Sequence, residues 1–482
     1  MGCGILTTYT QIANIAGLQG LLVYALCGAI PIFLFSLVGP QIRKRCPEGF
    51  VLTEWVYQRY GTVAALYLSA FTILTMFLYM VSELTAVGGA ISAMTGLDPT
   101  PCVIVQCVVT SIYTALGGFK VSFVTDTFQG AFLMIFLVIG VIGYALNIEI
   151  DPQLKRETEG ELLGSNKLGW MLVYILFIAI VTNDCFLAGF WLRTFAAKTN
   201  KDLMIGTGIA SVAICIICVL VGLPGILAVW TGDLTIGSED GWNAFFILIA
   251  DMSNWVIGII LVFAVGLSTC NFDSLQSATT TTISNDIFRN KLPMIWVRFL
   301  VWLVMVPSIV VALKASANVL QIYLIADLVS ASVIPVLFLG LSKKFFFLNQ
   351  WDIMIGGLGA ILAVFIFGTI YYGSALEGGR LLLIYNGLYS DSDWGAFGAF
   401  VIAPWGGMLI GLSSAGCRIL YYYIYSRITK TPFTALDYVE PQHKSSKYTN
   451  ESDEQEINEI EEDLMTVDSV QYKKSRSQDF SD

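Results

Sequence analysis

Polar side chains gather in one apolar stretch of the chain, residues 261–286, whose residue types could bind a solute or an ion. The stretch begins as an apolar run of membrane-spanning character and then carries Ser268, Thr269, Cys270, Asn271, Asp273, Ser274 and Gln276. A polar group left unpaired in hydrocarbon costs several kcal/mol. As a helix, this stretch must therefore face the interior of a bundle or a watery cavity, and it is a candidate wall of a solute path.

Helical spacing places some of these residues on one face. Polar side chains recur at intervals of four, three, four and three residues at Cys270, Ser274, Ser277, Thr281 and Ser284, with Asp273, Gln276 and Thr280 on a neighbouring stripe. Small hydroxyl residues also pack membrane helices together, so packing is the alternative for each of them. Asp273 favours a functional role, because an acid at membrane depth is rare.

Four acidic residues lie inside predicted membrane spans, where Lys and Arg are nearly absent: Glu83, Asp184, Asp273 and Asp327. An ionised carboxylate in a medium of low dielectric constant requires a positive partner or a proton. The four acids together indicate binding of a cation or of protons, and a hydrogen-bonded structural role is the alternative for each. Thr182, Asn183 and Asp184 also interrupt the apolar run 169–190. Broken helices expose backbone groups that bind ions and solutes.

Composition excludes most soluble and enzymatic classes. Of the 482 residues, 56% are hydrophobic and only 13% are charged, which predicts an all-α polytopic membrane protein. The sole histidine, His443, lies near the C-terminus, which argues against Ser-His-Asp catalysis and His-based metal sites. We therefore predict no enzyme activity, no metal site and no cofactor apart from a coupling ion. Nucleic acid is not an expected partner, whereas membrane lipid and a small solute are.

Eleven apolar runs are predicted membrane spans, at residues 17–39, 64–95, 100–118, 127–147, 169–190, 204–230, 254–284, 297–314, 319–341, 354–372 and 396–424. The short loops on one side hold most of the basic residues, for example Arg43, Arg59, Arg289 and Lys343. Positive charge marks the cytoplasmic side of a membrane protein. This pattern predicts a multi-pass protein with a cytoplasmic C-terminus. Residues 438–482 are polar and acidic, and we expect a disordered tail there.

Several segments resemble signatures of the sodium:solute symporter family. Residues 113–129, YTALGGFKVSFVTDTFQ, resemble a span that ends in a Gly-Gly turn before an Asp-x-x-Gln helix start, and residues 45–61 resemble the first cytoplasmic loop. GFWLRTFAAK at 189–198, SNDIFRN at 284–290 and VSASVIPVLF at 329–338 are similar to segments around the sixth, eighth and tenth core spans. The chain most resembles the urea active transporters of fungi within this family.

The resemblance implies a core of ten helices in two inverted five-helix repeats, with alternating access around a site at the membrane midplane. Residues 1–13 would be the remnant of a clipped first core helix, as in an N-terminally truncated chain. Residues 14–147 would complete the first repeat and 169–341 the second. Two additional helices would follow within 354–425. The expected location is the plasma membrane.

The same resemblance implies a cation site between the first core helix and two hydroxyl residues of the eighth. Those two positions fall here on Cys270 and Asn271, with Ser268 and Ser274 close by. Sodium prefers hard oxygen ligands, so a thiol is a poor substitute. Both H+ and Na+ stay open as coupling ions, and proton coupling through Asp273 or Asp184 is the favoured hypothesis.

The predicted function is cation-coupled uptake of urea or of a small related solute such as a polyamine. Urea needs paired donors and acceptors, which Asn271, Ser274 and Gln276 could offer. A polyamine needs carboxylates, and the predicted substrate-binding residues are Glu83, Asn183, Asp184, Asp273, Gln276 and Asp327. The alternative is a membrane receptor or regulatory paralogue of the same family that does not transport. Nothing in the sequence indicates an oligomeric state.

Overall fold

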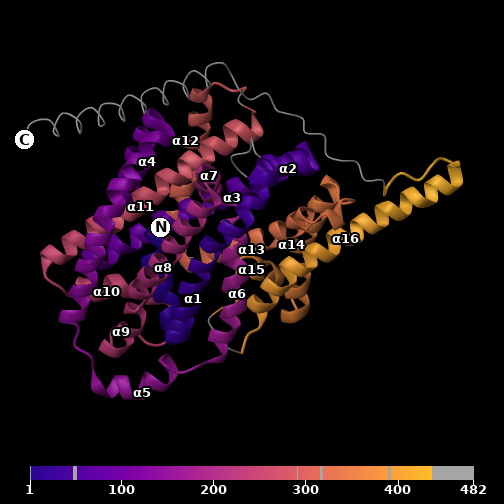
Figure 1. Cartoon of the computed structure of the whole chain (residues 1–482). Helices are drawn as coiled ribbons and strands as arrows, with labels where there is room; N and C mark the ends of the chain where they lie inside the picture. The colour runs from indigo at the N-terminus through magenta and orange to yellow at the C-terminus, as the bar shows by residue number, and fades with distance from the viewer. Residues whose placement is uncertain (1, 47–51, 290, 315–318, 389–391, 437–482) are drawn as a thin grey trace, which may run out of the picture. The chain divides into compact units, whose positions relative to one another are not determined.

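The computed structural model describes residues 2–46, 52–289, 291–314, 319–388 and 392–436, and it describes only the backbone at 113, 115–133, 136, 192, 294 and 301. Within these ranges the chain is helical and contains no strand (Figure 1). The first ten α-helices are α1 Gly4–Arg45, α2 Leu52–Tyr60, α3 Thr62–Thr95, α4 Thr100–Asn147, α5 Pro152–Leu162, α6 Lys167–Asp184, α7 Ala188–Ala196, α8 Asn200–Gly222, α9 Pro224–Thr231 and α10 Ala244–Ala250. The others are α11 Asn254–Thr281, α12 Met294–Lys314, α13 Val319–Phe338, α14 Gln350–Tyr372, α15 Ala375–Leu382 and α16 Gly395–Thr429. Short turns of other helix types lie at Glu239–Asn243 (η1), Thr282–Ile287 (η2), Leu339–Leu341 (η3) and Lys343–Phe345 (η4).

Most of the predicted spans coincide with long apolar helices. Among the described residues, nine helices or helix pairs are long and apolar enough to cross a membrane. They correspond to nine of the eleven predicted runs, since α8 and α9 together cover the run 204–230. The helices α14 and α16 account for the two additional helices predicted within 354–425. The tail predicted at 438–482 lies outside the described residues.

The remaining two predicted spans, 100–118 and 127–147, lie on a single helix. The helix α4 runs without interruption from Thr100 to Asn147, so the turn predicted after Gly117 and Gly118 is wrong. Each glycine weakens a helix by about 1 kcal/mol but does not break it, and no proline follows Pro101 in this segment. Most side chains of the signature at 113–129 lie outside the described residues.

The helix α1 reverses direction at Gly17. Gly17 has φ 62° and ψ −158°, a conformation open to glycine, and a Cβ there would collide with the Leu162 backbone. The rings of Tyr9 and Tyr24 stack with centroids 4.1 Å apart. Fifteen residues of straight helix would rise about 22 Å, so the chain must fold back between them. We call residues 4–16 the first arm of α1 and residues 18–45 the second arm.

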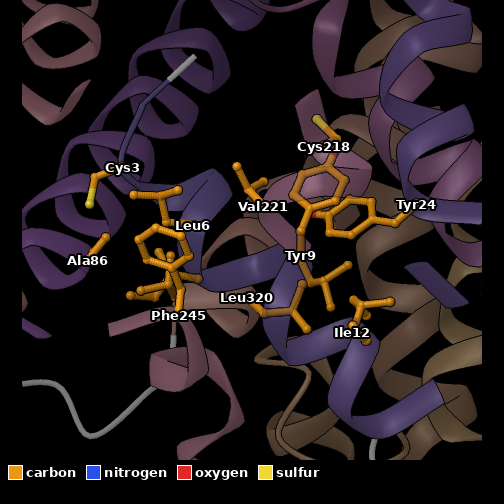
Figure 2. Packing of buried hydrophobic residues seen from close by; sticks show 14 of the residues in the cluster. Cys3, Leu6, Tyr9, Ile12, Tyr24, Ala86, Cys218, Val221, Phe245 and Leu320 are labelled. Atoms are coloured by element: carbon orange, nitrogen blue, oxygen red, sulfur yellow. The ribbon is translucent and has the colours of Figure 1, made fainter. Parts of the chain in front are cut away.

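The first arm packs in the centre of the bundle. Leu6 and Ile12 are fully buried, and Figure 2 shows Leu6 beside Phe245 of α10 and Tyr9 beside Tyr24 of the second arm. Gln11 donates to the Ser238 carbonyl at 3.2 Å and Asn14 donates to the Thr235 carbonyl at 3.0 Å. The first arm is therefore fixed to the connection between α9 and α10.

The predicted interruption of the run 169–190 is confirmed. The helix α6 ends at Asp184, and α7 begins at Ala188. The Phe186 amide donates to the Asn183 carbonyl at 2.8 Å, and the Trp191 indole donates to the Cys185 carbonyl at 2.8 Å. These bonds hold the break in one conformation and place Asp184 at the end of a helix in the interior of the bundle.

Basic side chains tie several helices together at one end of the bundle, which we call the basic end. Arg43 of α1 donates to the Ala197 carbonyl after α7 at 2.9 Å. Arg59 of α2 donates to the Phe345 carbonyl in η4 at 3.0 Å. Arg289 donates to the Tyr57 hydroxyl of α2 at 3.3 Å and lies over its ring. The end of α1 is thus fixed to the end of α7, and α2 is fixed to η4 and to the segment after η2.

The helices α14 and α16 pack closely, as Figure 1 shows for the segments coloured orange to yellow. Small residues make the approach possible, since a Cβ added at Gly356 would lie 2.9 Å from the Gly407 carbonyl oxygen. Asp352 at the start of α14 is buried and pairs with Arg418 of α16, with 2.7 Å between Oδ2 and Nη2. This ion pair fixes the register of the two helices.

Candidate substrate and cation site

Glu83 of α3 is fully buried and joins three other elements. Its carboxylate accepts hydrogen bonds from the Cys3 backbone amide at 2.8 Å, the Asn271 side chain at 2.9 Å and the Tyr323 hydroxyl at 2.9 Å. These donors come from the start of the first arm, from α11 and from α13. Three donors from separate elements satisfy the hydrogen-bonding capacity of this buried carboxyl group. Glu83 thus holds one end of a polar group of side chains in the interior.

Asp184 and Asp327 form a second acidic group on the facing helices α6 and α13. They are 8% and 5% exposed, and their carboxyl groups interact electrostatically. The hydroxyls of Thr182 and Ser330 lie 3.0 Å apart and pin the two helices together beside the acids. Oδ1 of Asp327 is buried without a hydrogen-bond partner among the described residues. A buried carboxyl group in that state needs a proton or a cationic ligand.

Four tyrosines surround these acids. Tyr79 and Tyr323 are half-buried and meet edge to face, with centroids 4.6 Å apart. Tyr79 lies within electrostatic range of both Asp184 and Asp327, and the stacked pair Tyr9 and Tyr24 approaches them from α1. We call the set of Glu83, Asp184, Asp327, Tyr9, Tyr24, Tyr79 and Tyr323 the acid–tyrosine cluster. Carboxylates and aromatic rings together suit an organic cation.

The structure brings five of the predicted site residues to this cluster: Glu83, Asn183, Asp184, Asn271 and Asp327. The Asn183 amide donates to the Tyr79 hydroxyl. Asn271 donates to Glu83, so it faces the cluster from α11. A series of contacts thus links Glu83 to Tyr323, Tyr323 to Tyr79, and Tyr79 to Asn183 beside the break between α6 and α7.

The other predicted site residues of α11 are distributed over several faces of that helix. Ser268 is buried, accepts from the Gln106 side chain of α4 at 2.7 Å and donates to the Glu83 carbonyl at 3.4 Å. Gln276 donates to the Ser111 hydroxyl of α4 at 3.1 Å, so it faces α4 and is not brought to the cluster. Asp273 is fully buried, and Cys270 and Ser274 are half-buried. Cation binding by Ser268, Cys270, Asn271 and Ser274 stays a prediction.

Reasoning from the sequence missed the tyrosines of the cluster. Tyr79 precedes Glu83 by four residues, and Tyr323 precedes Asp327 by four residues, a spacing that places each pair on one helix face. This repeated tyrosine-to-acid spacing was the available signal. No group of three or more His, Cys, Asp or Glu side chains suited to a metal ion occurs among the described residues.

Comparisons with known proteins identify the family of the chain. The sequence pattern of the sodium:solute symporter family matches residues 12–346. The spermidine transporter DUR31 of Candida albicans is 61% identical over 438 residues, which cover 91% of this chain and 84% of that protein. The urea-proton symporter DUR3 of rice is 26% identical over 137 residues, and a probable urea active transporter of Schizosaccharomyces pombe is 27% identical over 122 residues. These two alignments cover 28% and 25% of this chain, and 19% and 18% of the relatives.

A solved structure of the same architecture supports the fold. The substrate-bound, outward-open state of a Na+-coupled sialic acid symporter has a TM-score of 0.61 and 16% sequence identity, and the match covers 86% of this chain and 90% of that chain. The predicted fold class, a helical membrane bundle of the sodium symporter type, is thereby confirmed. The chain belongs to the sodium:solute symporter family and is a membrane solute transporter.

Proposed function

We propose that this protein takes up a polyamine of the spermidine type across the plasma membrane and that the acid–tyrosine cluster binds it. One observation carries the proposal: Asp184 and Asp327 are buried and interact electrostatically, and Oδ1 of Asp327 has no hydrogen-bond partner in the described part of the chain. A polyamine carries several ammonium groups joined by methylene chains. Such a molecule satisfies buried carboxylates and packs on aromatic rings.

The relatives support the same substrate class. The spermidine transporter of Candida albicans is similar over most of the chain, whereas the urea transporters are similar over about a quarter of it. Urea is the second candidate, because Asn271 could pair with an amide. In the structure, however, Asn271 already donates to Glu83, and Gln276 faces α4. Neither feature favours a neutral amide as cargo.

Proton coupling is the proposed energy source. Asp184 and Asp327 interact electrostatically, so two like charges would repel each other unless one is protonated or a cation binds. One carboxyl group of the pair can then hold a proton while the other binds the cationic substrate, as proton-driven uptake requires. We further propose that the basic end faces the cytoplasm, because positive residues mark that side.

Uptake of labelled spermidine tests the proposal directly. The full chain is expressed in yeast cells that lack endogenous polyamine uptake, and its presence at the cell surface is measured by biotinylation. We expect saturable spermidine uptake that unlabelled putrescine reduces and that a hundredfold excess of urea leaves unchanged. Competition by urea would support the second candidate. A chain that reaches the surface and moves neither solute would contradict both and favour a receptor.

A further inference from the structure

A small cavity lies between the break of α6 and α7 and the basic end. Its volume is about 20 Å³, enough for one group the size of a water molecule. The polar lining comes from α2, α3, α11 and η2, and consists of Thr53, Thr72, Thr281, Thr282 and Asp286. The other lining residues are apolar or aromatic. Among them are Cys185 and Phe186 from the break and Trp191 from α7. One acid thus faces a compact cavity with both hydroxyl and aromatic walls.

Asp286 has a hydroxyl partner and no basic one among the described residues. The Ser69 hydroxyl of α3 donates to its Oδ2 at 3.2 Å, and Thr53 of α2 lines the same cavity as Asp286. Arg289, three residues further on, is held by Tyr57 and Thr62 of other elements at 3.3 Å each. Asp286 lies in the π-helical turn η2, and such turns often occur at functional sites.

The cavity adjoins the acid–tyrosine cluster along the chain. Cys185 and Phe186 line the cavity, and they directly follow Asp184, which belongs to the cluster. On the opposite side, Thr53 belongs to α2, the helix that contains Arg59 and that Arg289 contacts at the basic end. The cavity with Asp286 therefore has walls from both the break and the basic end.

We infer that this cavity binds one primary ammonium group of an alkylamine and serves as a relay site toward the basic end. An ammonium group is water-sized and donates three hydrogen bonds, for which the Asp286 carboxylate and threonine hydroxyls are acceptors. Aromatic walls such as Phe186 and Trp191 also favour an alkylammonium. A bare alkali ion fits less well, because a thiol and aromatic groups replace hard oxygen ligands over much of the wall. The transport role rests on the proposed function, whereas amine binding itself does not require transport.

Protection of the segment around Cys185 from hydrogen exchange tests the inference at the cavity itself. The purified full chain is transferred to deuterated buffer in the presence of butylammonium or of its neutral analogue 1-butanol, and exchange of the amides at 185–191 is followed by peptide mass spectrometry. We expect butylammonium to slow exchange in this segment several-fold and 1-butanol to have no effect. The segment around the exposed Cys417 is the internal control, and its exchange rate stays unchanged.

Variants separate this cavity from the neighbouring cluster. Asp286→Asn is expected to abolish the protection, and Asp202→Asn, which changes an exposed acid at the start of α8, is expected to retain it. Protection that persists in Asp286→Asn, or that is lost only in Asp184→Asn, would overturn the inference. Equal protection by 1-butanol would also overturn it. If Asp286→Asn does not fold, Thr282→Val replaces it, with a smaller loss of protection expected.

Transport kinetics distinguish failure of the inference from failure of the proposed function. If the wild type takes up spermidine, Asp286→Asn should lower the maximal rate several-fold and leave KM within twofold, because the cluster is intact. Normal rates in Asp286→Asn would contradict the relay role alone. Absence of spermidine uptake by the wild type would contradict the proposed function, and protection of the segment 185–191 by butylammonium would still report amine binding.

Discussion

Asp184 and Asp327 are the two buried acids on which the proposed substrate binding depends. Each carboxyl group lies in the interior without a basic partner among the described residues, and four tyrosine rings lie near the group that they form with Glu83. Glu83 differs from them because three donors already satisfy it. We therefore propose substrate binding first for Asp184 and Asp327, and a positioning role for Glu83.

Replacing Asp327 by Asn keeps the shape of the side chain and removes its charge. We expect a ten- to hundredfold rise in KM for spermidine, because a hydrogen bond to a charged group contributes about 1.5–3 kcal/mol. The measurement is labelled uptake normalised to the surface amount of the protein. Asp202→Asn, an exposed acid at the start of α8, is the control with unchanged uptake. An unchanged KM in Asp327→Asn would remove this acid from the binding site.

Among the helices, two features decide how the site is assembled: the reversal of α1 at Gly17 and the break between α6 and α7. The reversal brings Tyr9 and Tyr24 together, and the break delivers Asp184 to the interior. Neither element forms the cluster alone, because Tyr79 and Tyr323 come from α3 and α13. The site therefore depends on packing between distant parts of the chain.

Gly17→Ala tests the reversal of α1. A non-glycine residue in the left-handed region costs about 1–2 kcal/mol, and the added Cβ would also meet the Leu162 backbone. We expect a melting temperature several degrees lower in detergent and reduced uptake. Gly160→Ala in α5 is the matched control, since a Cβ there meets nothing within 4 Å. Equal melting temperatures for the two variants would show that the turn tolerates a side chain.

Arg418→Ala tests the ion pair between α14 and α16. Breaking a buried pair costs up to about 3–5 kcal/mol, and here the loss should lie at the lower end because Arg418 is 22% exposed. Arg380→Ala removes the more exposed partner of Glu377 and should cost less than about 1 kcal/mol. Thermal unfolding of the two variants in detergent gives the comparison. A larger loss for Arg380→Ala would contradict the assigned register contact.

Sequence and structure agree best where apolar length alone decides the outcome. The hydrophobic runs predicted nine spans correctly. The acids that lie inside these runs are side chains that the structure places in the interior. The predicted boundary between the remnant at 1–13 and the span 17–39 lies at the reversal of α1, but the conformation of Gly17 was not predicted, because a glycine in an apolar run fits a straight helix equally well. The positions of the tyrosines and the contact between Gln106 and Ser268 depend on which helices become neighbours. The periodicity within one helix carries no information about its neighbours.

For the transporter as a whole, the proposed coupling ion depends on which side chains can gain or lose a charge during the transport cycle. The predicted cation-binding residues of α11 include a thiol and an amide, and the amide of Asn271 binds Glu83. The interacting pair of Asp184 and Asp327 is the better place for a proton. Substrate and proton would then meet at one group of side chains, so that each affects the binding of the other.

Ion replacement in uptake assays tests the coupling. We expect spermidine uptake to be abolished by a protonophore and to change less than twofold when choline replaces Na+, because the proposed driving ion is H+. Rising external pH should lower the uptake rate under the same conditions. Membrane potential is clamped with K+ and valinomycin as the control. Strict dependence on Na+ would contradict proton coupling and return attention to Ser268, Cys270, Asn271 and Ser274.

The bond between Glu83 and the amide of residue 3 has an evolutionary consequence. A main-chain donor is supplied by every amino acid except proline, so the bond itself does not require a cysteine at position 3. The Cys3 side chain is fully buried, so the space around it restricts the position to small residues. Alignments of homologues would therefore show a preference for size and not for chemistry at this position. Deep mutational scanning should reveal it as a position that accepts alanine and serine and rejects proline and large side chains.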